Sequence, residues 1–260
     1  MKHMGLVLGA LVVLAPAAAR AGAAFTATTK VESSPRRPLP LGNSTVRGWV
    51  DGDRGKIELA GSANRVTPGG DVLLTTDGGK TIRHFDLERK ECHPWTRPAP
   101  RESRVGPGSP VSTSFENVRV EKTLDEPGPV IAGLSTRHVR LKSEYDTVVT
   151  GQGSAHRSRT AATDDLWIAE KLRDPGFSIW LTTGSPGAEG GDLGAKLDAV
   201  LANVSGVPVK RVSVATVAFD GGKPVTTTTT VEVSRLRREK IAPSTFAPPL
   251  DCAKRTDRRR

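Results

Sequence analysis

The segment VLLTTDGGKTIRHFDL at residues 72–87 comes closest in this chain to known chemistry. A phosphate-binding loop of the form G-x-x-x-x-G-K-[ST] needs a glycine five residues before Gly79, but Leu74 stands there. The Asp-box of sialidase-type β-propellers fits around Asp77, but Ile82 replaces the usual tryptophan and the regular blade repeat is missing. A hairpin turn needs only an Asp-Gly pair and a following glycine, so we predict a hairpin.

The other residues that could catalyse a reaction or bind a metal lack the required spacing. The segment DGDRG at residues 51–55 resembles a calcium loop, but Lys56 stands where that loop needs glycine. Thr183 replaces the first glycine of a Gly-x-Ser-x-Gly nucleophile elbow. The histidines beyond the N-terminal segment have no metal-ligand spacing: His84, His93, His138 and His156. We therefore expect no metal, no cofactor and no enzymatic activity.

The N-terminus predicts export from the cytoplasm. A short basic start (MKH) precedes an apolar run at residues 4–15, and small residues at A-x-A spacing follow. We predict a signal peptide at residues 1–23, cleaved after Ala19, Ala21 or, by preference, Ala23. The apolar run is shorter than the roughly 20 residues of a membrane-spanning helix, so we expect a secreted or periplasmic protein without a transmembrane segment.

The charge of the chain is +10, and part of it lies in the C-terminal tail AKRTDRRR. We interpret residues 251–260 as a basic, flexible, solvated tail, or as a segment attracted to anionic envelope surfaces. We expect no nucleic-acid partner, because no aromatic residues are interleaved with the basic ones for base stacking.

The chain has two cysteines, Cys92 and Cys252. An even number of cysteines in an exported protein favours a disulfide, which would tie the C-terminal tail to the middle of the chain. The alternative is two separate thiols, because pairing needs a closeness that spacing does not reveal.

The composition favours short strands and turns over long helices: 4% of the residues are aromatic, and there are 27 glycines and 19 prolines. We predict strands at residues 25–34, 46–50, 56–59, 115–123, 136–141, 166–169, 177–181, 208–219 and 225–236, and a loop at 94–110. The only helix that we predict begins at Asp192 and ends at Gly206, with an apolar stripe from Leu193 to Val204 that packs on the sheet. The fold class is mainly β (α+β), a single curved antiparallel sheet in one domain at residues 24–250.

Five segments follow one another in an order that resembles a family of exported bacterial proteins of unknown function. They are VRGWVDGDRGKIEL, DVLLTTDGGKTIRHFDLERKE, VIAGLSTRHVRLKSEY, DDLWIAEKL and EVSRLRREKIAPSTFAPP. The residues at the family's motif positions are Asp86, Lys90, Gly133, Thr136, His138, Trp167, Ala169, Phe246 and Pro249. That family is similar in turn to the outer-membrane lipoprotein carrier superfamily. The resemblance implies an open β half-barrel that holds a lipid, a lipoprotein acyl chain or another hydrophobic ligand.

A curved sheet with one packed helix forms a cleft, and ligand clefts are mostly apolar with few polar anchors. We expect four aromatic residues to line it, with ordinary core positions as the alternative: Trp49, Phe85, Trp167 and Trp180. The predicted function is non-catalytic binding of a hydrophobic or amphipathic ligand. The alternative function is a structural or protein-interaction module of the envelope whose basic tail attracts polyanions.

Overall fold

Strands make up most of the described part of this protein. Many of them are rich in β-branched residues and alternate between buried and exposed positions. The computed structural model describes residues 21–35, 43–60, 70–95, 103–104, 110–151, 154–184 and 191–250. The strands are β1 (Gly22–Ser34), β2 (Ser44–Asp51), β3 (Arg54–Ala60), β4 (Val72–Thr75), β5 (Arg83–Asp86), β6 (Glu91–Pro94), β7 (Ser103–Arg104), β8 (Pro110–Pro127), β9 (Arg137–Gly151), β10 (Ser154–Ala169), β11 (Val207–Phe219) and β12 (Val225–Glu239). The predicted mainly-β class is confirmed.

The strands of the described residues form one open antiparallel sheet, in the order β6-β5-β4-β3-β2-β1-β12-β11-β10-β9-β8-β7. Strands that are neighbours in the sheet are also consecutive along the chain, except at the centre of the sheet. There β1 pairs with β12, which places Phe25 opposite Leu236. The first and last strands of the chain therefore lie in the middle of the sheet, and its two edge strands are β6 and β7.

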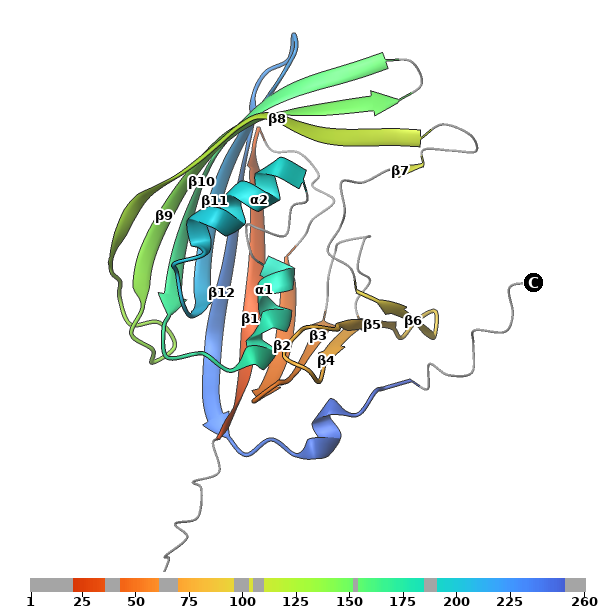
Figure 1. Cartoon of the computed structure of the whole chain (residues 1–260), viewed down its shortest axis with the longest axis vertical. Helices are drawn as coiled ribbons and strands as arrows, with labels where there is room; N and C mark the ends of the chain where they lie inside the picture. The colour runs from red at the N-terminus through yellow and green to blue at the C-terminus, as the bar shows by residue number, and fades with distance from the viewer. Residues whose placement is uncertain are drawn as a thin grey trace, which may run out of the picture.

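Two short helices lie on one side of the curved sheet, which we call the inner face (Figure 1). They are α1 (Ser178–Gly184) and α2 (Gly191–Leu201). Ile179 and Trp180 of α1 pack into the apolar core over the middle of the sheet. Leu193 and Leu197 of α2 pack over β8–β10, as the apolar stripe predicts.

The segment Phe177–Leu181, which we predicted as a strand, is helical, so that prediction is wrong. The 3-10 turn η1 (Pro175–Phe177) leads directly into α1. A short apolar run does not distinguish a strand from a buried helix. Pro175 suits the first turn of a helix, and the Trp180 indole N–H donates to the Pro208 carbonyl at 2.9 Å. The fold thus has a second packed helix that the sequence did not reveal.

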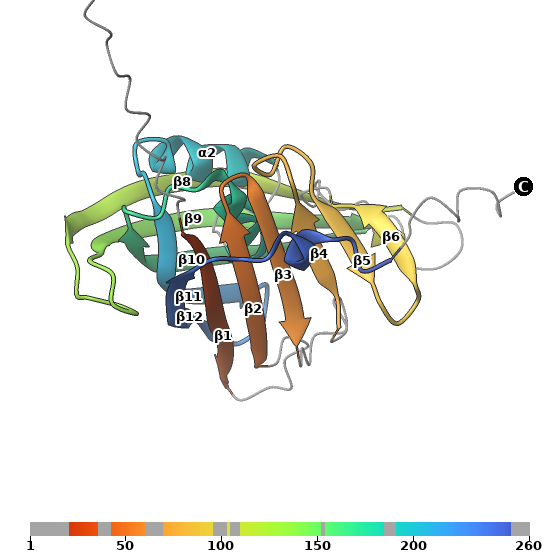
Figure 2. The ribbon, with the colours of Figure 1, turned by 90° about the horizontal axis from the view of Figure 1, so that it is seen from below.

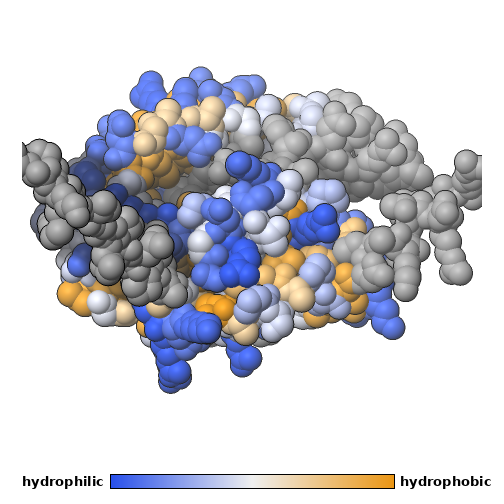
Figure 3. Space-filling view, turned by 60° about the horizontal axis from the view of Figure 1, so that its bottom comes forward, coloured by the Kyte–Doolittle hydropathy of each residue, from blue (hydrophilic) through white to orange (hydrophobic). Residues whose placement is uncertain are grey.

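A C-terminal segment covers part of the opposite side of the sheet, the outer face. It follows β12, includes the 3-10 turn η3 (Pro243–Phe246) and crosses β1–β5 (Figure 2). Ile241 and Phe246 pack there against Val72, Leu74 and Phe85. Seen partly from below, hydrophilic residues gather over the middle of the molecule and hydrophobic residues show between them (Figure 3).

The predicted hairpin at residues 72–87 is confirmed. Strands β4 and β5 pair across the turn, in which Gly78 and Gly79 have φ angles of 71° and 86°. A Cβ atom on Gly79 would lie 1.9 Å from Oγ of Ser178, at the start of α1. Glycine is therefore needed both for the backbone conformation and for the contact with α1.

Several predictions lie outside the described residues: most of the leader (residues 1–20), most of the loop at 94–110, the tail at 251–260, and Cys252. Cys92 lies on β6 and is disulfide-bonded. Its pairing with Cys252 stays a prediction. Among the described residues, no helix is long and apolar enough to cross a membrane.

Candidate functional site

A pocket of about 570 Å³ lies between α2 and strands β8 and β9. A β-bulge shapes it: the pairing of β8 with β9 jumps from Glu116–Asp146 to Arg119–Glu144, which leaves one extra residue on β8. Asn117 has a φ of 52° at this point, and Val118 turns inward against α2. The pocket is lined by Val118, Arg119, Val120, Glu121, Lys142, Ser143, Glu144 and Lys196.

Lys196 joins α2 to the bulge. Its Nζ donates to the backbone carbonyl of Val118 at 2.7 Å and lies 3.2 Å from a carboxylate oxygen of Asp192. The helix is thus held to β8 by apolar contacts at Leu193 and Leu197 and by a hydrogen bond to a carbonyl within the bulge. Asp192, predicted to cap the helix, lies instead in its first turn and pairs with this lysine.

The lining of the pocket combines apolar and charged groups. Val120 and Ser143 pair across β8 and β9 on the inner face, where Val120 packs against the apolar cluster beneath α2. The Glu144 carboxylate forms an ion pair with the Arg159 guanidinium, with 3.2 Å between Oε2 and Nη2. Val118, Val120, Leu141 and Ser143 face inward, so the alternation of β8 and β9 directs the side chains of Arg119, Glu121, Lys142 and Glu144 to the outer face. The pocket therefore offers an apolar floor with the Lys196 ammonium beside it, which suits an amphipathic molecule with an anionic group.

A second cluster of polar residues lies on the outer face, where Trp167 and His138 stack with ring centroids 4.6 Å apart. Leu166 and Ile168 point into the inner core, so the alternation of β10 directs Trp167 outward. Nε2 of His138 lies 2.6 Å from the Asp165 carboxylate, which also accepts from Arg140 Nε at 2.8 Å. Because the imidazole stacks on the indole and contacts a shared carboxylate, this cluster stabilises the pairing of β9 with β10.

A third cluster is buried on the inner face at β4 and β5. Nε2 of His84 lies 3.0 Å from Oδ2 of Asp71, an ion-pair distance, although the two atoms do not align as a hydrogen bond. Burial raises the pKa of the Asp71 carboxyl, and the nearby His84 opposes that rise only in part. The Trp95 indole stands edge-on to His84, and its N–H has no partner within the described residues.

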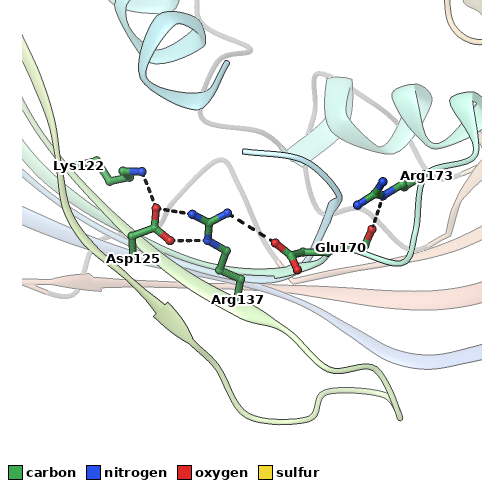
Figure 4. A network of polar contacts seen from close by, with 5 residues as sticks. All are labelled: Lys122, Asp125, Arg137, Glu170 and Arg173. Atoms are coloured by element: carbon green, nitrogen blue, oxygen red, sulfur yellow. Dashed lines mark hydrogen bonds and ion pairs between the residues drawn. The ribbon is translucent and has the colours of Figure 1, made fainter. Parts of the chain in front are cut away.

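A network of charged residues connects β8, β9 and the end of β10 (Figure 4). The Asp125 carboxylate accepts hydrogen bonds from Arg137 and Lys122, which lower the pKa of Asp125. Arg137 also lies 3.5 Å from Glu170, whose backbone carbonyl accepts from Arg173 at 2.9 Å. The network lies where the β8–β9 pairing shifts again, between Lys122 and Leu124, so it fixes the register beyond that irregularity.

The four aromatic residues predicted to line a cleft do not meet in one cavity. Trp180 lies in α1 and packs on Phe25 in the inner core. Phe85 is fully buried on the outer side, beneath the C-terminal segment. Trp49 is half-buried beside that same cluster, and Trp167 stacks on His138 elsewhere on the outer face.

Sequence reasoning missed the residues of the α2 pocket. Neither Val118 nor Val120 has a motif around it, and Lys142 and Lys196 read as ordinary surface charges. A weak signal was present in NVRVEKTLDEP, where Asn117 tolerates a positive φ better than most residues. The pocket itself needs α2 to pack over β8, a contact between segments distant in the sequence.

Comparisons of the chain with protein-family models, with curated proteins and with solved structures found no match. The resemblance to lipoprotein carriers therefore stays a hypothesis from the order of residues. Among the described residues, no three histidine, cysteine or acidic side chains gather as a metal ion would require.

Proposed function

We propose that this protein is an exported binding protein that takes an amphipathic small molecule into the pocket between α2 and β8–β9, without catalysing a reaction. The observation that carries the proposal is the pocket itself, about 570 Å³ between an amphipathic helix and a bulged strand. That volume lies within the range of about 300–1,000 Å³ in which proteins bind small ligands.

The lining favours an amphipathic ligand over a purely hydrophobic one. Val118 and Val120 supply apolar contact near the helix, where removing hydrocarbon from water is favourable. Lys196 supplies a positive charge at the same site. A fatty acid or a lipid with an anionic head group matches both properties.

To test the proposal, a substitution fills the pocket with a large side chain, and the binding of a defined probe is measured. The probe is cis-parinaric acid, an anionic fatty acid whose fluorescence rises in an apolar environment. Val120→Trp places a large ring on the pocket floor, and we expect it to weaken probe binding at least tenfold, about 1.4 kcal/mol. Val214→Trp is the matched control, because Val214 is exposed on β11, away from the pocket.

A second measurement identifies the natural ligand. Native mass spectrometry of the protein purified from its own envelope, followed by lipid extraction, is expected to show a bound amphiphile that Val120→Trp loses. The proposal fails if the purified protein never carries such a molecule and if Val120→Trp and Val214→Trp bind the probe equally. Far-UV circular dichroism of both variants verifies that they are folded.

A further inference from the structure

A narrow groove of about 220 Å³ crosses the outer face where β12, β1 and β2 lie side by side. The central strand carries small side chains at its outward positions, Ala24 and Thr26. The flanking strands carry long ones, Arg47 on β2 and Arg235 and Arg237 on β12. Small residues between large ones make the floor and the walls of the groove.

The register of the three strands sets the positions of the arginines. Thr26 pairs with Arg47 on one side and with Arg235 on the other, so these three residues form one row across the sheet. The two arginine Cα atoms are therefore separated by two strand spacings, about 10 Å. Side chains as long as arginine can reach a single small ion across that distance.

The next row completes the groove. Ala24 pairs with Trp49 on β2 and with Arg237 on β12. Trp49 also lies beside the apolar cluster of the outer face, with Lys56 Nζ 5.6 Å from its ring centroid. The groove thus has three guanidinium groups and one aromatic wall.

A β-bulge places two of these arginines on the outer face. Val231 and Val233 of β12 point into the inner core, so strict alternation would also direct Arg235 and Arg237 inward. The pairing of β1 with β12 shifts between Thr26 and Ala27, which makes Ser234 the extra residue. After the bulge, Leu236 faces the core and the two arginines face outward.

None of the three arginines has an ion pair or a side-chain hydrogen bond recorded within the described residues. Their neighbour Arg238, by contrast, points to the other face and pairs with Asp174 at 3.0 Å. Glu239 also lines the groove, at its end, so the local charge is three positive groups against one negative group. Three like charges around a small groove repel each other, and a bound anion would relieve that repulsion.

We propose that Arg47, Arg235 and Arg237 bind a phosphate group in this groove. Guanidinium groups donate paired hydrogen bonds to phosphate oxygens, and a tetrahedral anion offers oxygens toward both walls and the floor. Trp49 supplies an apolar surface beside the anion, which suits an organic phosphate. The site lies on the face opposite α2 and does not depend on the function proposed above.

The experiment titrates the full mature chain with inorganic phosphate by isothermal calorimetry at 0.15 M salt. We expect Arg47→Gln, Arg235→Gln and Arg237→Gln each to weaken binding at least tenfold. Arg83→Gln is the matched control, because Arg83 is exposed on β5, has no recorded partner among the described residues and lies three strands from β2. It removes the same charge, and we expect less than a twofold effect.

A second arm separates a free phosphate from a lipid head group. Vesicles of phosphatidylcholine with and without phosphatidic acid are sedimented with the wild-type chain and with the same variants. Loss of sedimentation in the three groove variants, but not in Arg83→Gln, assigns the site to a membrane phosphate. Calorimetric binding without vesicle binding assigns it to a soluble phosphate. Equal losses in Arg83→Gln, or no binding of either probe, overturn the proposal.

Discussion

Asp77 organises the turn of residues 75–81 through its carboxylate. Oδ1 accepts from the Thr81 backbone N–H at 3.0 Å and from the Thr75 hydroxyl at 3.0 Å, and Oδ2 accepts from the Thr81 hydroxyl at 2.6 Å. The hydrogen bond from the Thr81 hydroxyl, followed by that from its backbone, lowers the pKa of Asp77 to about 2. The segment that resembles a phosphate loop is therefore a self-contained turn.

This pKa predicts how the turn responds to acid. Because the folded pKa lies below the unfolded value of 3.8, the stabilisation is complete above pH 3.8 and disappears as the pH falls through about 2. Asp77→Asn should therefore lower the melting temperature by a few degrees at pH 6. The difference from wild type should shrink between pH 4 and pH 2, as followed by circular dichroism.

The control for this prediction is Asp220→Asn at the other Asp-Gly-Gly turn of the chain. Among the described residues, no hydrogen bond of the Asp220 side chain is recorded. We expect this variant to match wild type throughout the pH range. An equal loss in both variants, or a loss at Asp77→Asn that does not change with pH, would contradict the role of its carboxylate.

Among the elements, the C-terminal segment after β12 acts as a cover for the outer face. Phe246 is buried with Ile241 against β4 and β5, and the Arg54 guanidinium lies 4.9 Å from the Phe246 ring centroid. Truncating a side chain in such a site loses the favourable free energy of burying its apolar surface and leaves a cavity. The segment therefore belongs to the folded core, although it has little regular secondary structure.

We expect Phe246→Ala to lower the free energy of unfolding by about 3–5 kcal/mol, as for other buried phenylalanines. Chemical denaturation followed by tryptophan fluorescence measures this change. Phe219→Ala is the matched control, because Phe219 is 51% exposed at the end of β11 and should change stability by less than about 0.5 kcal/mol. A small effect at Phe246 would mean that the segment is not part of the cooperative core.

For the whole molecule, the pairing of β1 with β12 is the central connection of the sheet. Ala23 is fully buried in the inner core, and Gly22 pairs with Glu239. The Arg238 guanidinium also donates to the Ala21 carbonyl at 3.4 Å. The first residues after the predicted leader are thus part of the central strand.

This position makes a prediction about where the predicted signal peptide is cleaved. Cleavage after Ala19 or Ala21 leaves β1 whole, whereas cleavage after Ala23, the site favoured by the A-x-A pattern, removes Gly22 and Ala23. We expect N-terminal sequencing of the mature protein to begin at Arg20 or Gly22. A purified chain that begins at Ala24 should be less stable than one that begins at Gly22 by at least about 1 kcal/mol, since it loses strand hydrogen bonds.

Features governed by neighbouring residues could be predicted from the sequence. The Asp-Gly-Gly turn at Asp77, the strands beside it and the apolar stripe of α2 depend on local backbone preferences and on periodicity. Strands β8, β9 and β10 extend well beyond their predicted ranges. Their outer halves are mostly polar and show no sustained alternation of apolar and polar residues, while pairing with each other keeps them extended.

Tertiary structure alone decided where the two proposed binding sites lie. The α2 pocket requires a helix to pack over a bulge in β8, and the arginine groove requires the first strand to pair with the last. In both places a single inserted residue, within Asn117–Val118 or at Ser234, changes which side chains face each side of the sheet. Local preference gives at most a weak signal of such a shift, as at Asn117, because its stability comes from cores assembled between segments far apart in the chain.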